Sequence, residues 1–274
     1  MATLNQKVLP GFRLSLGYTV CYLSFLVLIP LAACFLKASS LSLQQFVTAV
    51  WTERARAAYQ LSFTVSLISA GSNVFLGLLV AWVLVRYKFP LKRLFDALVD
   101  LPLALPTAVA GLVYSSLYVP NGWLGRFLVP LGVEVAYSRL GIIMVLTFTG
   151  FPFVVRTVQP VLESLDIEVE EAAAILGATR WQTFCRIILP NIFPAVLTGF
   201  ALALARSLGE YGSVVFVSGN MPFKTEIAPV LIVARLEEFA YSEATAIAVV
   251  LLVLSFVMLA AINLSQSWSK SYAA

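Results

Sequence analysis

Residues 163–190, ESLDIEVEEAAAILGATRWQTFCRIILP, form a polar stretch between two long apolar segments. Residues 163–171 concentrate carboxylates, which complement the positive end of a helix dipole when they lie in a first turn. The run 172–176 has high helix propensity, and Gly177 stands where a left-handed residue would close the helix. Aromatic and aliphatic residues spaced three or four apart then predict a second short helix that ends at Pro190. The stretch therefore predicts two short helices joined at Gly177.

The segments on either side of this stretch are strongly apolar. Of the 274 residues, 60% are hydrophobic and 12% are charged, whereas a soluble domain carries about 25% charged residues. Six segments, each of roughly 20 residues or more, are long enough to cross the hydrocarbon of a membrane as helices. They are residues 14–36, 61–85, 95–118, 140–158, 193–218 and 244–264. We therefore expect an all-α integral membrane protein with six transmembrane helices. The first segment is too long for the apolar core of a signal peptide, so we expect it to be retained.

The basic residues predict the orientation of the chain. Six spans put both termini on one side, and ten Lys and Arg residues fall in the tails and loops of that side against seven on the other. Cytoplasmic loops carry an excess of Lys and Arg. We therefore expect a multi-pass protein of the cytoplasmic membrane, with both termini and residues 159–192 in the cytoplasm. A hairpin that lies on the membrane surface remains an alternative for residues 163–190.

The composition disfavours several classes of function. The chain has no His, which removes the commonest metal ligand and the usual general base. Its three cysteines show no disulfide or metal-binding spacing, so we expect no metal site. The basic residues do not form a patch interleaved with aromatic residues, so we expect no nucleic-acid partner. A Gly-x-x-x-x-Gly-Lys-[Ser/Thr] phosphate-binding loop does not occur either, so ATP hydrolysis is not expected from this chain.

The spacing of small and apolar residues in the polar stretch resembles the EAA loop of ABC importer permeases. The match comprises Glu171-Ala172-Ala173, Gly177-Ala178, Phe184, Ile187 and Leu189-Pro190. The resemblance implies a type I (MetI-like) permease fold, in which this loop forms cytoplasmic coupling helices that dock into a separate ATPase. Small side chains such as Ala173 would permit close approach of the ATPase. The residues expected to couple to it are Glu170, Glu171, Ala172, Ala173, Leu176, Gly177, Ala178, Thr179 and Phe184.

Two further stretches resemble the sulfate/thiosulfate branch of these permeases. They are residues 96–111, DALVDLPLALPTAVAG, and residues 205–212, ARSLGEYG. Molybdate permeases share the second in looser form, and Tyr211 stands where relatives commonly carry Phe. The similarity runs from Val8-Leu9-Pro10 to the last span and is strongest to the T-type (U-type) subunits of CysTWA sulfate importers. It implies three parts: a tail, first helix and outer loop (1–56), an ABC transmembrane type-1 domain (57–265) with the EAA loop at 163–190, and a C-terminal tail (266–274).

The resemblance also implies the partners and the mechanism. The chain would pair with a W-type permease, two copies of an ATPase that bind ATP and Mg, and a periplasmic sulfate- or thiosulfate-binding protein, all within membrane lipid. Sulfate would cross by alternating access at the interface of the two permeases. The chain itself would be a transport subunit without enzymatic activity and would hold no cofactor.

Sulfate is a dianion, and its passage through a low-dielectric region requires hydrogen-bond donors or positive charge. Two of the expected spans contain prolines, glycines and charges that could line such a pathway. The candidates are Asp100, Pro102, Pro106, Thr107, Arg206, Ser207, Gly209 and Glu210, with Ser115 and Ser116 as further donors. Arg206 lies deep in its span and needs a partner. An ion pair with Glu210 or Asp100, or direct contact with the anion, would each satisfy it.

Two other classes of protein remain as alternatives. A proton- or sodium-coupled secondary transporter would need no ATPase, but it usually shows more spans or an internal repeat. A membrane-embedded transferase or hydrolase should show clustered catalytic residues near one interface. Asp96 and Asp100 share a helix face and resemble a metal-binding pair, but no third carboxylate accompanies them.

Overall fold

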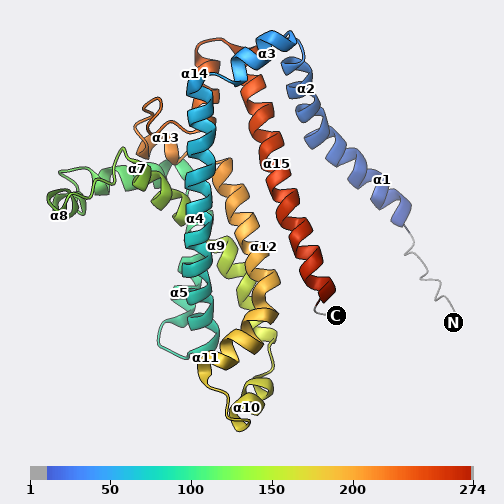
Figure 1. Cartoon of the computed structure of the whole chain (residues 1–274), viewed down its shortest axis with the longest axis vertical. Coiled ribbons are helices and arrows are strands. Elements are labelled where there is room, and N and C mark those ends of the chain that lie inside the picture. The colour runs from blue at the N-terminus through green and yellow to red at the C-terminus, as the bar shows by residue number, and fades with distance from the viewer. Residues whose placement is uncertain (1–10, 273–274) are drawn as a thin grey trace.

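The computed structural model describes residues 11–272, which are helices and connecting turns without a strand (Figure 1). Val8, Leu9 and Pro10, with which the resemblance begins, lie outside the described residues, as do the last two residues of the expected tail 266–274. In chain order the helices are α1 (Phe12–Leu23), η1 (Ser24–Leu28), α2 (Ile29–Ala38), α3 (Leu43–Val50), α4 (Glu53–Arg86), α5 (Lys92–Val99), α6 (Leu101–Ala104), α7 (Thr107–Tyr118), α8 (Gly125–Leu128), η2 (Val129–Leu131), α9 (Arg139–Ser164), α10 (Ile167–Ile175), α11 (Arg180–Thr183), η3 (Phe184–Ile188), α12 (Leu189–Leu208), α13 (Val214–Val217), α14 (Ala228–Glu237) and α15 (Tyr241–Tyr272).

The core of the molecule is a bundle of α4, α9 and α12. Val154 of α9 is fully buried and packs between small residues of the other two helices. A Cβ atom added to Gly77 of α4 or to Gly199 of α12 would come within 2.8 Å of Val154. Small residues let membrane helices approach closely, where dispersion contacts replace the hydrophobic effect as the source of stability. The three helices are therefore held together by close packing of their backbones.

The first apolar segment stands apart from this bundle. Its C-terminal half, α2, packs against α15, whereas α1 leans away from the bundle (Figure 1). None of the most apolar part of residues 14–38 is buried within the chain. Large side chains such as Leu14 and Tyr18 are instead exposed. An exposed apolar helix of this length suits a lipid environment.

Among residues 11–272, five helices are long and apolar enough to cross a membrane. They are Leu14–Ala38, Glu53–Arg86, Arg139–Ser164, Arg180–Leu208 and Tyr241–Leu264. The expectation of one continuous helix over residues 95–118 is wrong, because this segment forms α5, α6 and α7. Leu105 is extended (ψ 132°) and precedes Pro106, which disfavours a helical conformation in the residue before it and cannot donate a backbone hydrogen bond. The third segment is therefore broken at Leu105, immediately before Pro106, whereas Pro102 lies in the first turn of α6.

The long helices place two sets of short elements at opposite ends of the bundle. α10 and α11 lie at one end, and α3 and α14 lie at the other (Figure 1). Charged residues at the two ends of α4 contact both sets. Arg54 donates to Glu226 at 2.7 and 2.8 Å, just before α14, and Arg86 forms an ion pair with Glu170 in α10. α4 therefore connects the two ends of the molecule.

Candidate functional site

The joint between the two short helices of the polar loop has the predicted left-handed cap. Gly177 has φ +82°, and its N–H donates to Ala174 O at 3.0 Å. The next residue, Ala178, donates to Ala173 O at 3.0 Å. These two bonds are those of the Schellman motif, which satisfies the last carbonyl groups of α10. The prediction that α10 ends at a left-handed Gly177 is confirmed.

The prediction that the second short helix ends at Pro190 is wrong. Thr179 and Gln182 form a capping box that starts α11, and from there the chain is helical to Leu208. The turn before the proline is a π turn, in which the N–H of Leu189 donates to the carbonyl of Phe184. A proline lacks the N–H that an α-helix requires, and a widened turn next to it shifts the hydrogen-bond register. The second half of the polar loop and the fifth membrane segment therefore belong to one helix, Arg180–Leu208.

The residues expected to contact an ATPase lie on or near α10, and most of them are accessible. Glu171, Ala172, Leu176, Gly177 and Thr179 are exposed, and Glu170, Ala178 and Phe184 are half-buried. Ala173 is the exception: it is 7% exposed, so the expectation that it forms part of a docking surface is wrong. Its side chain is covered by other parts of this chain. The most exposed large apolar side chains of the loop are those of Ile175 and Leu176, at 86% and 88%.

The loop is attached to the membrane bundle by a charged pair. Glu170 of α10 pairs with Arg86, whose guanidinium also lies over the ring of Trp82 at 5.6 Å. Trp82 in turn packs edge-on against Phe184, with ring centroids 5.7 Å apart. The first turn of α10, the last turn of α4 and the start of the long helix after Thr179 are thus in direct contact.

Asp100 is not the ion-pair partner of Arg206, which was one of the alternatives for that arginine. It accepts two hydrogen bonds from Arg156 of α9, at 2.6 and 2.8 Å. Arg156 also donates to the carboxylate of Asp96 at 2.7 Å and to its carbonyl at 2.8 Å. The two aspartates therefore bind a guanidinium, and no group of three metal-binding side chains occurs among residues 11–272. This cluster attaches the broken third segment to α9.

Of the alternatives left open for Arg206, the ion pair with Glu210 is present in the structure. Glu210 is 2% exposed, and one of its oxygens pairs with Arg206. Its other oxygen accepts the N–H and the hydroxyl of Ser213, both at 2.9 Å. Arg206 retains 31% side-chain exposure, so its guanidinium is only partly covered. The hydroxyl of Ser207 is buried and has no hydrogen-bond partner among the described residues.

The candidate pathway residues fall into two groups in space. Thr107, at the start of α7, lies against Gly212, so the third segment meets the turn that follows α12. Arg206, Ser207, Gly209 and Glu210 lie in or next to that turn. Asp100 and Pro102 belong instead to the contact with α9. Of the further donors, Ser115 and Ser116 bond within the chain, to Tyr137 and to the Val113 carbonyl.

Two polar residues of the bundle were not identified by the sequence analysis. Arg156 lies only two residues before the end of the expected fourth span, so it is one of the ten basic residues that were assigned to the cytoplasmic tails and loops. Asn73 is fully buried in α4, and neither atom of its amide has a partner among the described residues. A Cβ atom added to Gly150 of α9 would come within 2.6 Å of that amide. A lone amide inside an apolar segment is the signal that could have indicated this residue.

Comparison with known proteins agrees with this arrangement. Residues 73–270 match the family described as binding-protein-dependent transport system inner membrane component. The chain belongs to this family. It is 47% identical, over 97% of its length and 96% of the relative, to the sulfate transport system permease protein CysT of Escherichia coli (strain K12). It is 49% identical, over 93% of its length and 89% of the relative, to the protein of the same description in Synechocystis sp. (strain ATCC 27184 / PCC 6803 / Kazusa).

Solved structures of the same fold are more distant in sequence. A bacterial ABC transporter involved in the import of the acidic polysaccharide alginate matches with a TM-score of 0.76 and 19% identity, over 93% of this chain and 94% of that one. The MetNI methionine ABC transporter in inward-facing conformations matches with a TM-score of 0.54, over 84% of this chain and 99% of that one. These likenesses establish the type I ABC importer permease fold. The family match contains α10, the third segment and Arg206, and the domain boundaries expected at 57 and 265 stay predictions.

Proposed function

We propose that this chain is a permease subunit of an ATP-driven importer that moves sulfate across the cytoplasmic membrane. The observation that carries the proposal is the near-full-length identity of 47–49% to permeases described as parts of sulfate transport systems. Such a level of identity over nearly the whole chain favours a shared substrate class. Thiosulfate has the same charge and similar tetrahedral geometry, so we extend the proposal to it.

The energy would come from a separate ATPase in two copies, each binding ATP and Mg. The C-terminal end of α10 supports this part of the proposal. Ile175 and the next residue, Leu176, are both exposed there and offer an apolar surface within a polar loop. Exposed apolar residues on a polar loop are typical of protein interfaces. The chain would act as a transport subunit and bind no cofactor itself. Both termini and α10 would lie in the cytoplasm.

The pathway would form where this chain meets a W-type permease, and a periplasmic sulfate- or thiosulfate-binding protein would deliver the anion. Alternating access would expose the pathway first to one side and then to the other. Arg206 precedes the candidate donor Ser207 and would supply positive charge to the pathway. Its guanidinium forms an ion pair with Glu210 and remains partly exposed. Thr107 and the buried hydroxyl of Ser207 would donate hydrogen bonds to the anion.

The test is uptake of labelled sulfate, thiosulfate and molybdate by cells that lack this chain and by the same cells complemented with it. We expect sulfate and thiosulfate uptake to require the chain and its ATPase. Equal sulfate uptake with and without the chain, or a requirement for molybdate uptake alone, would overturn the proposed substrate. Uptake that persists when the ATPase is deleted would instead favour secondary transport.

A further inference from the structure

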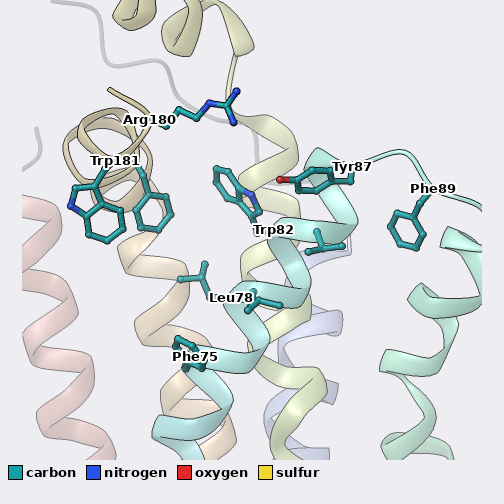
Figure 2. A pocket seen from close by; sticks show the side chains of 10 residues that line it. Phe75, Leu78, Trp82, Tyr87, Phe89, Arg180 and Trp181 are labelled. Carbon is teal, nitrogen blue, oxygen red and sulfur yellow. The ribbon is translucent and has the colours of Figure 1, made fainter. Parts of the chain in front are cut away.

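An apolar groove lies on the surface of the bundle, away from the candidate pathway residues. It is formed by the half of α4 nearest to α10 and by the start of the long helix that follows Thr179, and its volume is about 890 Å³. Figure 2 shows the side chains that line it. Phe75 and Leu79 line the part that lies deeper along α4, and both are more than half exposed.

The lining residues of the groove change in character along the axis of α4. Trp82, Tyr87 and Trp181 surround its mouth, whereas Phe75 lies at its other end (Figure 2). Seven residues separate Phe75 from Trp82, which corresponds to about 10 Å along a helix. Trp and Tyr concentrate at the level of lipid headgroups, because their rings are apolar and their N–H and O–H groups are polar. With α10 at the cytoplasmic surface, as the proposed function has it, the mouth of the groove would lie at headgroup level and Phe75 in the hydrocarbon.

A positive charge stands at the mouth of the groove. Arg180 is exposed, and no carboxylate lies within ion-pair distance of it among residues 11–272. In contrast, Arg86, Arg156 and Arg206 each have a carboxylate partner. The capping box of Thr179 fixes where the helix starts and so where Arg180 lies. A guanidinium at headgroup level binds phosphate oxygens through charge-assisted hydrogen bonds.

We propose that this groove binds one anionic phospholipid, with its phosphate on Arg180 and an acyl chain against Phe75 and Leu79. The polar and apolar parts of the groove favour this occupant. A phospholipid carries one negative group at one end and a long apolar chain at the other, and the groove has one free cation at its mouth and aromatic and aliphatic residues below it. A transmembrane helix of a partner would meet the apolar part but would leave Arg180 without a counterion.

Photocrosslinking in the assembled importer tests the identity of the occupant. A p-benzoylphenylalanine in place of Leu79, in bilayers of phosphatidylglycerol and phosphatidylethanolamine in equal amounts, should crosslink to lipid, which mass spectrometry of the adduct identifies. We expect phosphatidylglycerol adducts to be enriched by about fivefold, the effect of one basic residue at an anionic surface. The matched control is the same substitution at Phe256 of α15, an apolar residue that is 70% exposed.

The charge of Arg180 gives a second test. Arg180→Gln should reduce the phosphatidylglycerol enrichment at Leu79 to the ratio found at Phe256, and Arg180→Lys should retain most of it. Equal headgroup ratios at Leu79 and Phe256 in the unaltered chain would overturn the proposal. A crosslink from Leu79 to the second permease or to the ATPase would also overturn it, since the groove would then be a subunit interface.

Discussion

Arg86, the last residue of α4, forms an ion pair with Glu170 in the first turn of α10. The pair joins the longest helix of the bundle to the loop that we expect to contact the ATPase. Glu170→Gln should therefore leave insertion unchanged and lower the stimulation of ATPase turnover by the loaded binding protein several-fold. The charge swap Arg86→Glu with Glu170→Arg should recover part of it. ATPase assays of the reconstituted complex measure this effect, and full stimulation in Glu170→Gln would remove the pair from the coupling route.

The positive φ of Gly177 gives a second prediction. Gly177→Val should destabilise the joint by about 1–2 kcal/mol, because an L-residue with a side chain is strained in the left-handed region and a β-branched one most of all. A Cβ atom at Gly177 would meet nothing within 4 Å, so the strain would come from the backbone alone. The matched control is Gly177→Asn, which tolerates this conformation. We expect Gly177→Val to co-purify with less ATPase than Gly177→Asn does, and equal amounts would contradict the prediction.

The third prediction concerns the ion pair between the buried carboxylate of Glu210 and the partly exposed guanidinium of Arg206. Arg206→Leu should leave an uncompensated carboxylate and destabilise the assembled permease by about 3–5 kcal/mol. Glu210→Gln, combined with Arg206→Leu, should restore assembly, because the amide oxygen can still accept from Ser213. The double variant with Glu210→Leu should restore less, since Ser213 would lose its acceptor.

The yield and thermal stability of the purified permease pair distinguish these variants. If Arg206→Leu with Glu210→Gln assembles normally but does not transport sulfate, Arg206 also has a role in the pathway. If no double variant assembles better than Arg206→Leu alone, the ion pair is not what requires the arginine.

A fourth prediction concerns topology. In a chain without native cysteines, a cysteine in place of Ile175 should react with a membrane-impermeant reagent only after permeabilisation, and one in place of Leu131 should react in intact cells. Both side chains are highly exposed. Gly122, in the same connection as Leu131, is unsuitable for a cysteine substitution. A Cβ atom there would come within 2.5 Å of the carbonyl oxygen of Ser116. The reverse labelling pattern would place α10 outside the cell and exclude its contact with an ATPase.

Some parts of the fold could be predicted because they depend on local sequence. The left-handed cap at Gly177 follows from a helix-forming run and one glycine, and the pair of Arg206 and Glu210 follows from a spacing of one helical turn. Such features need only neighbours in the chain. Five of the six expected apolar segments were found for the same reason, although their ends differ by up to 13 residues.

Other parts could not be predicted because they depend on which segments meet. Asp100 could approach either of two arginines, and only the packing of the third segment on α9 selects Arg156. Ala173 looked like a surface residue because it is small, yet the fold turns it inward. Pro190 is a common stop signal for helices, but a neighbouring π turn lets the helix continue. Each error concerns a contact or a hydrogen-bond register that a linear pattern does not contain.

The uninterrupted helix from Arg180 to Leu208 has a mechanical consequence. It is about 43 Å long and carries the groove and the loop contact at one end and Arg206 at the other. If the loop at one end contacts an ATPase as proposed, a small tilt imposed there would displace the guanidinium of Arg206 at the other end of the helix. The π turn at Phe184–Ile188 is the place where this helix would bend most easily, so its stiffness would decide how much of such a tilt reaches Arg206.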